Sequence, residues 1–154
     1  ALPRVTTPRA ELDKSDFEPF KRLAHHALAM TAHVVYEAVD SEAPATMSST
    51  VISQVIRQQI GFQGLLMTDD LSMHALSGDF ASRTQDAFAA GCDVVLHCNS
   101  DMGEMGAIAD ALHDLAGDAA HRAAAALQVL PDPDDEDEAA LRAEFSALVE
   151  QTNS

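Results

Sequence analysis

Two short apolar runs, each followed by a stretch with helical spacing, constrain the fold of this chain more than any other feature. Residues 65–67 (LLM) and 94–96 (VVL) show no alternation of polar and apolar side chains. Such uninterrupted runs are typical of strands in a parallel sheet whose two faces are both covered. The run HALAMTAH, which ends at His33, is also of strand length. We therefore expect an α/β fold with three parallel strands near residues 28–33, 64–69 and 93–98.

The connecting helices are located by the spacing of apolar residues and by capping signals. Ser48 or Ser49 is a suitable N-cap for the second helix, and Gly61 and Gly91 follow two helices as stops. Residues 1–14 contain two prolines and no sustained period, so we expect an extended segment there. The expected helices cover residues 17–24, 51–60, 80–90, about 105–115, 119–130 and 138–150.

Three strands are too few for a complete parallel fold. A doubly wound domain uses about five strands, and a β/α barrel uses eight over roughly 250 residues. The three βα units therefore look like consecutive units of a larger sheet, and we expect the chain to be incomplete.

Charge and hydropathy exclude several classes of protein. The chain has 25 acidic and 9 basic residues, a formal charge of −16, so its surface repels phosphate backbones and nucleic acid is not an expected partner. No apolar run approaches the roughly 20 residues of a membrane span, and no apolar signal segment follows residues 1–9. Residues 131–138 (PDPDDEDE) carry six acids and read as a solvated linker before the last helix.

The two cysteines indicate a reducing environment. Cys92 and Cys98 flank the third expected strand, which places them roughly 20 Å apart at about 3.3 Å per residue. A disulfide needs Cα atoms within about 7 Å, so these two cannot pair. Two free cysteines without an export signal favour a cytoplasmic location.

Polar residues at the strand ends are the candidates for chemistry, because parallel folds bind ligands at the carboxyl ends of their strands. Asp69 and Asp70 end the second strand and His33 ends the first. The two carboxylates are suited either to catalysis or metal binding or to capping the following turn. His33 is suited either to catalysis or to a satisfied structural role. The chain has no zinc-type Cys/His spacing and no glycine-rich phosphate loop, so we expect neither a metal nor a cofactor.

Four segments together resemble glycoside hydrolase family 3, in particular the bacterial β-N-acetylglucosaminidases of cell-wall recycling. They agree with that family in order and spacing, and the resemblance covers about residues 1–115. The segments are residues 60–73 (IGFQGLLMTDDLSM), 30–36 (MTAHVVY), 44–49 (PATMSS) and 90–99 (AGCDVVLHCN).

The resemblance implies the C-terminal portion of a (β/α)8 TIM-type barrel, with about three parallel βα units followed by helices. Residues 1–130 are then a partial barrel domain, and residues 131–154 an acidic linker with a C-terminal helix. The implied activity is a retaining exo-β-N-acetylglucosaminidase acting on muropeptide fragments of peptidoglycan. Asp69 matches the family's nucleophile. Asp70 matches a residue that supports the turn, and His33 and Met73 become candidate walls of the sugar pocket.

The chain departs from the family in one respect. The family's acid/base histidine lies in a K-H-F-P-G-H-G…D-x-H pattern, which is absent from these 154 residues. The family places that pattern directly before a segment like Ala1 to Val5. We therefore expect the acid/base group and the remainder of the barrel to come from sequence outside this chain.

Two other functions remain open from the residues. A strand that ends in an exposed aspartate also resembles a signalling receiver domain phosphorylated on Asp69. Such a domain needs a lysine after its last strand, and the only lysines here are Lys14 and Lys21. A non-catalytic interaction fragment is compatible with the acidic tail.

Overall fold

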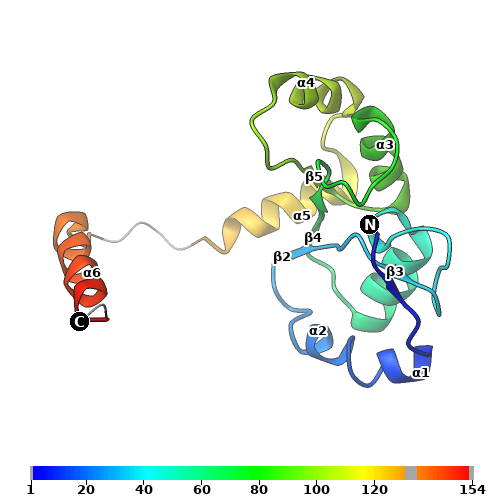
Figure 1. Ribbon diagram of the computed structural model, residues 1–154, viewed down its shortest axis with the longest axis horizontal. Helices are drawn as coiled ribbons and strands as arrows, with labels where there is room; N and C mark the ends of the chain where they lie inside the picture. The colour runs from blue at the N-terminus through cyan, green and yellow to red at the C-terminus, as the bar shows by residue number, and fades with distance from the viewer. Residues whose placement is uncertain (1, 131–134, 153–154) are drawn as a thin grey trace.

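A parallel sheet of three strands forms the centre of the protein (Figure 1). The computed structural model describes residues 2–130 and 135–152. Strand β4 (Leu65–Asp70) lies between β2 (Leu28–Met30) and β5 (Val94–Leu96), and both pairings are parallel. The three predicted strands are therefore confirmed, with their carboxyl ends at one edge. The first ends at Met30 rather than near His33, and the third covers 94–96 rather than 93–98.

The amino-terminal segment is more structured than its sequence indicates. Strand β1 (Arg4–Val5) pairs in parallel with β3 (Val35–Tyr36), which forms a second, two-stranded sheet. Helix α1 (Arg9–Leu12) follows, so the expectation of an extended segment over residues 1–14 is wrong for residues 9–12. Leu12 is completely buried against Phe17 and the helix that begins at Val51. This contact stabilises a helix too short to show any period in the sequence.

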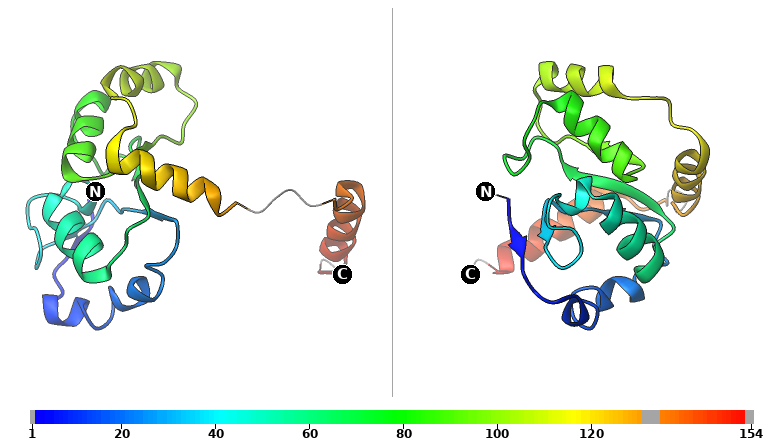
Figure 2. Two further views of the ribbon diagram at one scale, coloured as in Figure 1. Left: turned by 180° about the vertical axis from the view of Figure 1, so that it is seen from behind. Right: turned by 90° about the vertical axis from the view of Figure 1, so that its right-hand side faces the viewer.

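Helices cover the sheet (Figure 2). Their buried side chains form the main core with those of the strands. The short 3₁₀ helix η1 (Ala45–Met47) leads into the π-helix η2 (Val51–Ile60), and α3 (Phe80–Ala90) connects β4 to β5. Leu66 of β4 packs against Ile52 of η2 and Ala87 of α3 in one buried cluster. Helix α2 (Glu18–Arg22) lies beside η2 and is shorter than the predicted 17–24.

The predicted helix signals are present in the structure. The Ser48 hydroxyl accepts a hydrogen bond from the Val51 N–H at 3.1 Å, which caps the first turn of η2. Gly61 and Gly91 end η2 and α3 with φ of +82° and +112°, a left-handed conformation that side chains disfavour.

The last three helices differ from the prediction mainly at their ends. Helix α4 (Met102–Ala111) begins three residues before the predicted 105, because the Asp101 carboxylate accepts the N–H groups of Gly103 and Glu104 as an N-cap. Helix α5 covers Gly117–Gln128 and α6 covers Glu138–Thr152. None of the helices within the described ranges is both long and apolar enough to cross a bilayer.

Helix α6 lies apart from the sheet and its helices in Figure 1. Its three apolar residues at helical spacing, Leu141, Phe145 and Leu148, are between 50% and 68% exposed. Residues 131–134 of the predicted acidic linker lie outside the described residues.

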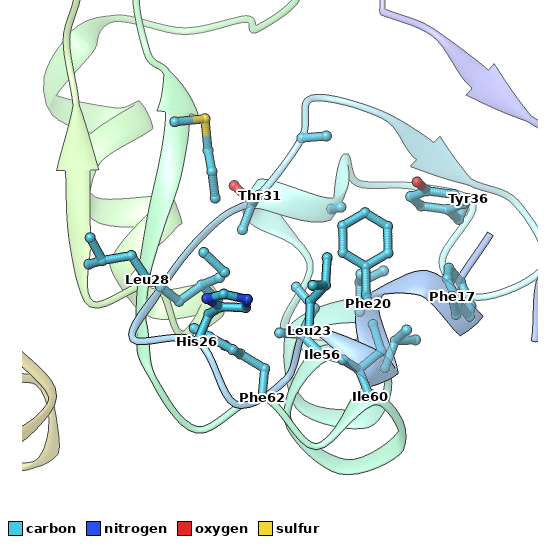
Figure 3. A pocket seen from close by; sticks show the side chains of 17 residues that line it. Phe17, Phe20, Leu23, His26, Leu28, Thr31, Tyr36, Ile56, Ile60 and Phe62 are labelled. Atoms are coloured by element: carbon cyan, nitrogen blue, oxygen red, sulfur yellow. The ribbon is translucent and has the colours of Figure 1, made fainter. Parts of the chain in front are cut away.

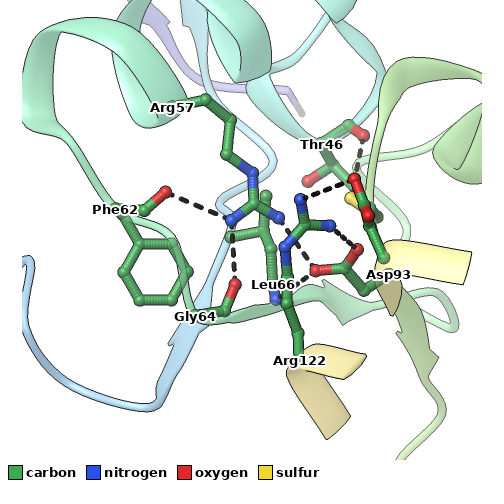
Figure 4. Close-up of polar contacts among 9 residues, drawn as sticks. Thr46, Arg57, Phe62, Gly64, Leu66, Asp93 and Arg122 are labelled. Carbon is green, nitrogen blue, oxygen red and sulfur yellow. Dashed lines mark hydrogen bonds and ion pairs between the residues drawn. The ribbon is translucent and has the colours of Figure 1, made fainter. Parts of the chain in front are cut away.

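A buried carboxylate, Asp93, ties the amino-terminal end of β5 to two helices (Figure 4). Its side chain is 5% exposed and lies 2.8 Å from the guanidinium groups of both Arg57 and Arg122. It also accepts the Leu66 N–H at 2.9 Å. Arg57 donates further to two carbonyl oxygens of the loop between η2 and β4. The charge of Asp93 is thus compensated by two cations, which fasten η2 and α5 to the sheet.

We expect Asp93→Ala to lower the free energy of unfolding by about 3–5 kcal/mol, because it leaves two partly buried guanidinium groups without their carboxylate. Arg142→Ala is the control, since its pair with Glu138 is almost 80% exposed and is worth about 0.5 kcal/mol or less. Urea unfolding of both variants measures the difference. Equal effects of the two substitutions would contradict the role given to Asp93.

Deletion of residues 131–154 should shift the unfolding temperature by no more than about 2 °C, because the apolar side chains of α6 bury little surface. A thermal unfolding scan of the deleted and intact proteins measures the shift. A fall of more than about 5 °C would mean that Leu141, Phe145 and Leu148 dock on the remainder of the protein.

Candidate active site

The predicted strand-end residues Asp69, Asp70 and His33 lie together at the carboxyl edge of the sheet, and the structure adds His97 to them. Asp69 and Asp70 end β4, His97 directly follows β5, and His33 lies three residues beyond β2. His33 Nε2 is 2.9 Å from the Asp70 carbonyl oxygen, although the two residues are 37 positions apart. His97 is close enough to the Asp70 carboxylate to act on it electrostatically. The parallel pairing predicted from the apolar runs thus gathers the candidates on one side.

Strand β4 contains a bulge where Asp69 lies. Met67 pairs with Val94 and Asp70 with Leu96, so β4 has one more residue than β5 between the two pairs. The Thr68 hydroxyl accepts the Leu96 N–H at 2.9 Å, which satisfies a backbone donor at this irregularity. Bulges redirect side chains and are common beside active sites. The two residues of β4 inside this irregularity are Thr68 and Asp69.

The Asp69 carboxylate is half-buried and oriented by its own backbone neighbour. Its Oδ1 accepts the Asp70 N–H at 2.8 Å. The Asp69 N–H in turn donates to Thr31 Oγ1 at 3.3 Å. These contacts fix the position of a carboxylate that is also partly open to solvent. Such a group is suited to attack an electrophile placed above the strand end.

Asp70 organises the turn that follows β4. Its carboxylate accepts the Ser72 N–H at 2.9 Å, the Ser72 hydroxyl at 2.5 Å and the Cys98 N–H at 3.2 Å. Burial raises the pKa of Asp70, but the hydrogen bonds from Ser72 and Cys98 and the nearby His97 outweigh burial and leave the pKa below its ordinary value. Asp70 therefore caps the turn after β4, which is one of the roles that the sequence leaves open for the aspartate pair.

His33 is almost completely buried, with 3% of its surface exposed. Its Nδ1 lies 2.9 Å from the Thr46 hydroxyl, and that hydroxyl lies 2.8 Å from the hydroxyl of Thr31. Thr46 belongs to η1, and nothing in its local sequence marks it as a partner of His33. Met73, in contrast, is 42% exposed in the turn after β4.

Neither thiol is paired in the structure, as the sequence predicts. Cys92 is buried and Cys98 is exposed. Burial is the main cause that raises the pKa of the Cys92 thiol to about 12, so this side chain stays protonated at neutral pH. Within residues 2–130 and 135–152, His, Cys, Asp and Glu side chains form no group of three or more that could hold a metal ion.

An apolar groove of about 430 Å³ lies between α2, η2 and β2 (Figure 3). Phe20, Leu23 and Leu28 line it and are each at least half exposed. Asp69 is not one of the lining residues. The lining is mainly apolar, and its polar residues are His26, Thr31 and Tyr36. Like Asp69, Asp70 is not among the lining residues.

The sequence and the fold both match a known enzyme family. Residues 1–130 match the family described as Glycosyl hydrolase family 3 N terminal domain. The chain belongs to glycoside hydrolase family 3. The resemblance found in the residues around Asp69 is thereby confirmed.

Family 3 relatives with curated names are beta-hexosaminidases. Those from Alkalilimnicola ehrlichii and Psychromonas ingrahamii are 44% and 39% identical to this chain over 102 and 108 residues. The alignments cover 64% and 67% of this chain, but 29% and 32% of the relatives. The chain therefore spans about a third of the length of the curated relatives it matches.

Solved structures of family 3 enzymes have the same fold over most of the chain. A β-N-acetylglucosaminidase from Paenibacillus sp. str. FPU-7 superposes with a TM-score of 0.72 at 27% identity, covering 89% of this chain and 30% of that one. NagZ from Neisseria gonorrhoeae, in complex with N-trifluoroacetyl-D-glucosamine, gives 0.58 at 29% identity, covering 84% and 41%. The α/β fold, as part of a TIM-type barrel, is thus confirmed.

We expect Asp70→Asn to lower the free energy of unfolding by about 1–3 kcal/mol near pH 7, because the turn loses a charged acceptor. A carboxyl with a depressed pKa in the folded state stabilises the protein above its unfolded pKa of about 3.9, and that stabilisation is lost as the pH falls through the folded value. The difference between wild type and variant should therefore shrink between about pH 5 and pH 2. Urea unfolding across this range measures it, and a constant difference would contradict the assignment.

Proposed function

We propose that this chain carries the nucleophile of a retaining exo-β-N-acetylglucosaminidase that releases terminal N-acetylglucosamine from muropeptide fragments of peptidoglycan. The observation that carries the proposal is the position of Asp69. Its carboxylate lies at the carboxyl end of the central strand, at a bulge, and is held by the Asp70 N–H. The names of the relatives, beta-hexosaminidase and β-N-acetylglucosaminidase, support the sugar specificity.

In the proposed reaction Asp69 is the nucleophile. Its carboxylate attacks the anomeric carbon and the bond from that carbon to the leaving oxygen breaks, which gives a glycosyl ester on Asp69. Water then attacks the same carbon and loses a proton to the group that protonated the leaving oxygen, which releases N-acetylglucosamine and restores the carboxylate. The leaving oxygen needs a proton from a general acid, which in this proposal comes from sequence outside residues 1–154. Met73 contributes a wall of the sugar pocket, and Asp70 and His33 support the nucleophile.

The partners follow from the same proposal. The enzyme acts on a carbohydrate in the cytoplasm, with neither nucleic acid nor a membrane as its partner. The remaining strands of the barrel pack against the apolar surfaces that this chain leaves open. The half-exposed Leu28 and Met30 of β2 and the groove beside them are the surfaces we assign to that contact.

Asp69→Ala in the natural protein, with any sequence that flanks residues 1–154, should lower kcat on an aryl N-acetyl-β-glucosaminide by several orders of magnitude, on the order of 10³–10⁶-fold. The unfolding temperature should change little, because a half-buried carboxylate at a strand end supports few packing contacts. Asp86→Ala on the exposed side of α3 is the matched control and should retain wild-type activity. Normal turnover by Asp69→Ala would refute the assignment of the nucleophile.

The chain of 154 residues alone should not turn over this substrate even with Asp69 intact, since general acid–base assistance alone is worth roughly 10²–10⁴-fold.

A fluorinated N-acetylglucosaminide should label Asp69 in the natural protein, as mass spectrometry of a peptic digest would show. Labelling of Asp69 by acetyl phosphate in place of the sugar would favour a receiver domain.

A further inference from the structure

We propose that His33 is a positioning residue for the Asp69–Asp70 segment, and that it acts through a chain of hydrogen bonds with Thr46 and Thr31. This inference rests on the proposed role of Asp69 as the nucleophile. It goes further by naming the buried groups that hold the nucleophile in place. In this arrangement none of the three side chains has to touch the sugar.

Four hydrogen bonds join the two ends of the segment. The Asp69 N–H donates to Thr31 Oγ1 at 3.3 Å, and the hydroxyl oxygens of Thr31 and Thr46 are 2.8 Å apart. Thr46 Oγ1 lies 2.9 Å from His33 Nδ1, and His33 Nε2 lies 2.9 Å from the Asp70 carbonyl oxygen. The chain of contacts therefore begins at the peptide N–H of Asp69 and ends at the peptide carbonyl of Asp70.

For an imidazole that carries one ring hydrogen, the two end groups set the direction of every hydrogen bond in the chain of contacts. A carbonyl oxygen only accepts, so the hydrogen of the neutral His33 ring is on Nε2, and Nδ1 accepts from the Thr46 hydroxyl. Thr46 Oγ1 then accepts from the Thr31 hydroxyl, and Thr31 Oγ1 accepts from the Asp69 N–H. One tautomer of one imidazole thus satisfies all four contacts with one hydrogen each.

Burial leaves the groups of this network with few alternative hydrogen-bond partners. Thr31, His33 and Thr46 are exposed by 6%, 3% and 0%, so water cannot readily replace a missing partner. A buried polar group that loses its partner carries the full cost of its desolvation, which favours a single arrangement of the network. The Asp69 carboxylate is itself bonded to the Asp70 N–H at 2.8 Å, so any shift of that peptide moves the nucleophile.

We expect the loss of one of these hydrogen bonds to slow the chemical step and to leave the binding of the sugar nearly unchanged. A nucleophile must lie about 3–3.5 Å from the carbon it attacks, and a displacement of about 1 Å can cost on the order of 10²-fold in rate. A residue that only holds the fold together would lower the unfolding temperature without a selective effect on kcat.

Thr46→Val tests the chain of hydrogen bonds in the natural protein, because it removes the hydroxyl and keeps the shape of the side chain. We expect kcat on the aryl glycoside, and the rate of labelling of Asp69 by the fluorinated sugar, to fall roughly 10- to 100-fold, with KM within about twofold. Thr84→Val is the matched control. Thr84 is equally buried, but its hydroxyl donates to the Phe80 carbonyl oxygen of its own helix, so kcat should stay near wild type.

Two substitutions at His33, one that keeps an N–H donor and one that does not, distinguish a positioning role from a packing role. Glutamine can place an amide N–H near the position of Nε2, so His33→Gln should retain kcat within about tenfold of wild type. His33→Leu should lose at least as much as Thr46→Val. A His33→Gln variant as slow as His33→Leu at equal thermal stability would overturn the role of the Nε2–H donor.

The failures of the two proposals are distinguishable. No labelling of Asp69 in the wild-type protein would refute the proposed function itself. Wild-type labelling together with unchanged rates in Thr46→Val and His33→Leu would refute the positioning role alone.

Nitrogen-15 NMR of the wild-type protein gives a test that needs no variant to fold, because the ring shifts show which nitrogen carries the hydrogen. A hydrogen on Nδ1 of neutral His33 would overturn the inference.

Discussion

The parallel pairing of β4 with a neighbour on each side is the constraint on which the rest of this structure depends. Backbone hydrogen bonds to β2 and β5 set all three strands in one direction, so three carboxyl ends meet at one edge. Residues from three distant parts of the chain, His33, Asp69 and His97, gather there. The helices that cover the sheet are required by the same pairing, since each parallel connection must cross from one end of the sheet to the other.

The two ends of the sheet are stabilised by different means. At the amino-terminal end a fully charged network, Asp93 with Arg57 and Arg122, fastens helices to strands. At the carboxyl end Asp70 accepts hydrogen bonds from Ser72 and from a backbone N–H of the segment after β5, which holds two loops together. The first arrangement contributes to the fold. The second leaves Asp69 beside it with one carboxylate oxygen bonded to the backbone and the side chain partly open.

Much of the fold was predictable from local patterns, and the departures have physical causes. The apolar runs located all three central strands, and glycines located the ends of η2 and α3. Helix α1 was missed because its stability comes from Leu12 in a cluster with η2, which no short window of sequence contains. Helix α4 begins before the predicted residue 105 because Asp101 is an N-cap, a role that depends on the conformation of the segment before the helix.

The sequence by itself determined that Asp69 and Asp70 follow a buried strand, and that His33 follows its neighbour, because strand length and polarity are local properties. The residues alone left two roles open for the aspartate pair, and the family resemblance assigned the turn to Asp70. Only the tertiary structure shows the contacts of that turn, which include the Cys98 N–H from the segment after β5. Only the tertiary structure joined His33 to Thr46 and to Asp70, and Asp93 to Arg57 and Arg122. These partners are 13 to 37 positions apart, and their contacts exist only once the sheet and its helices have packed.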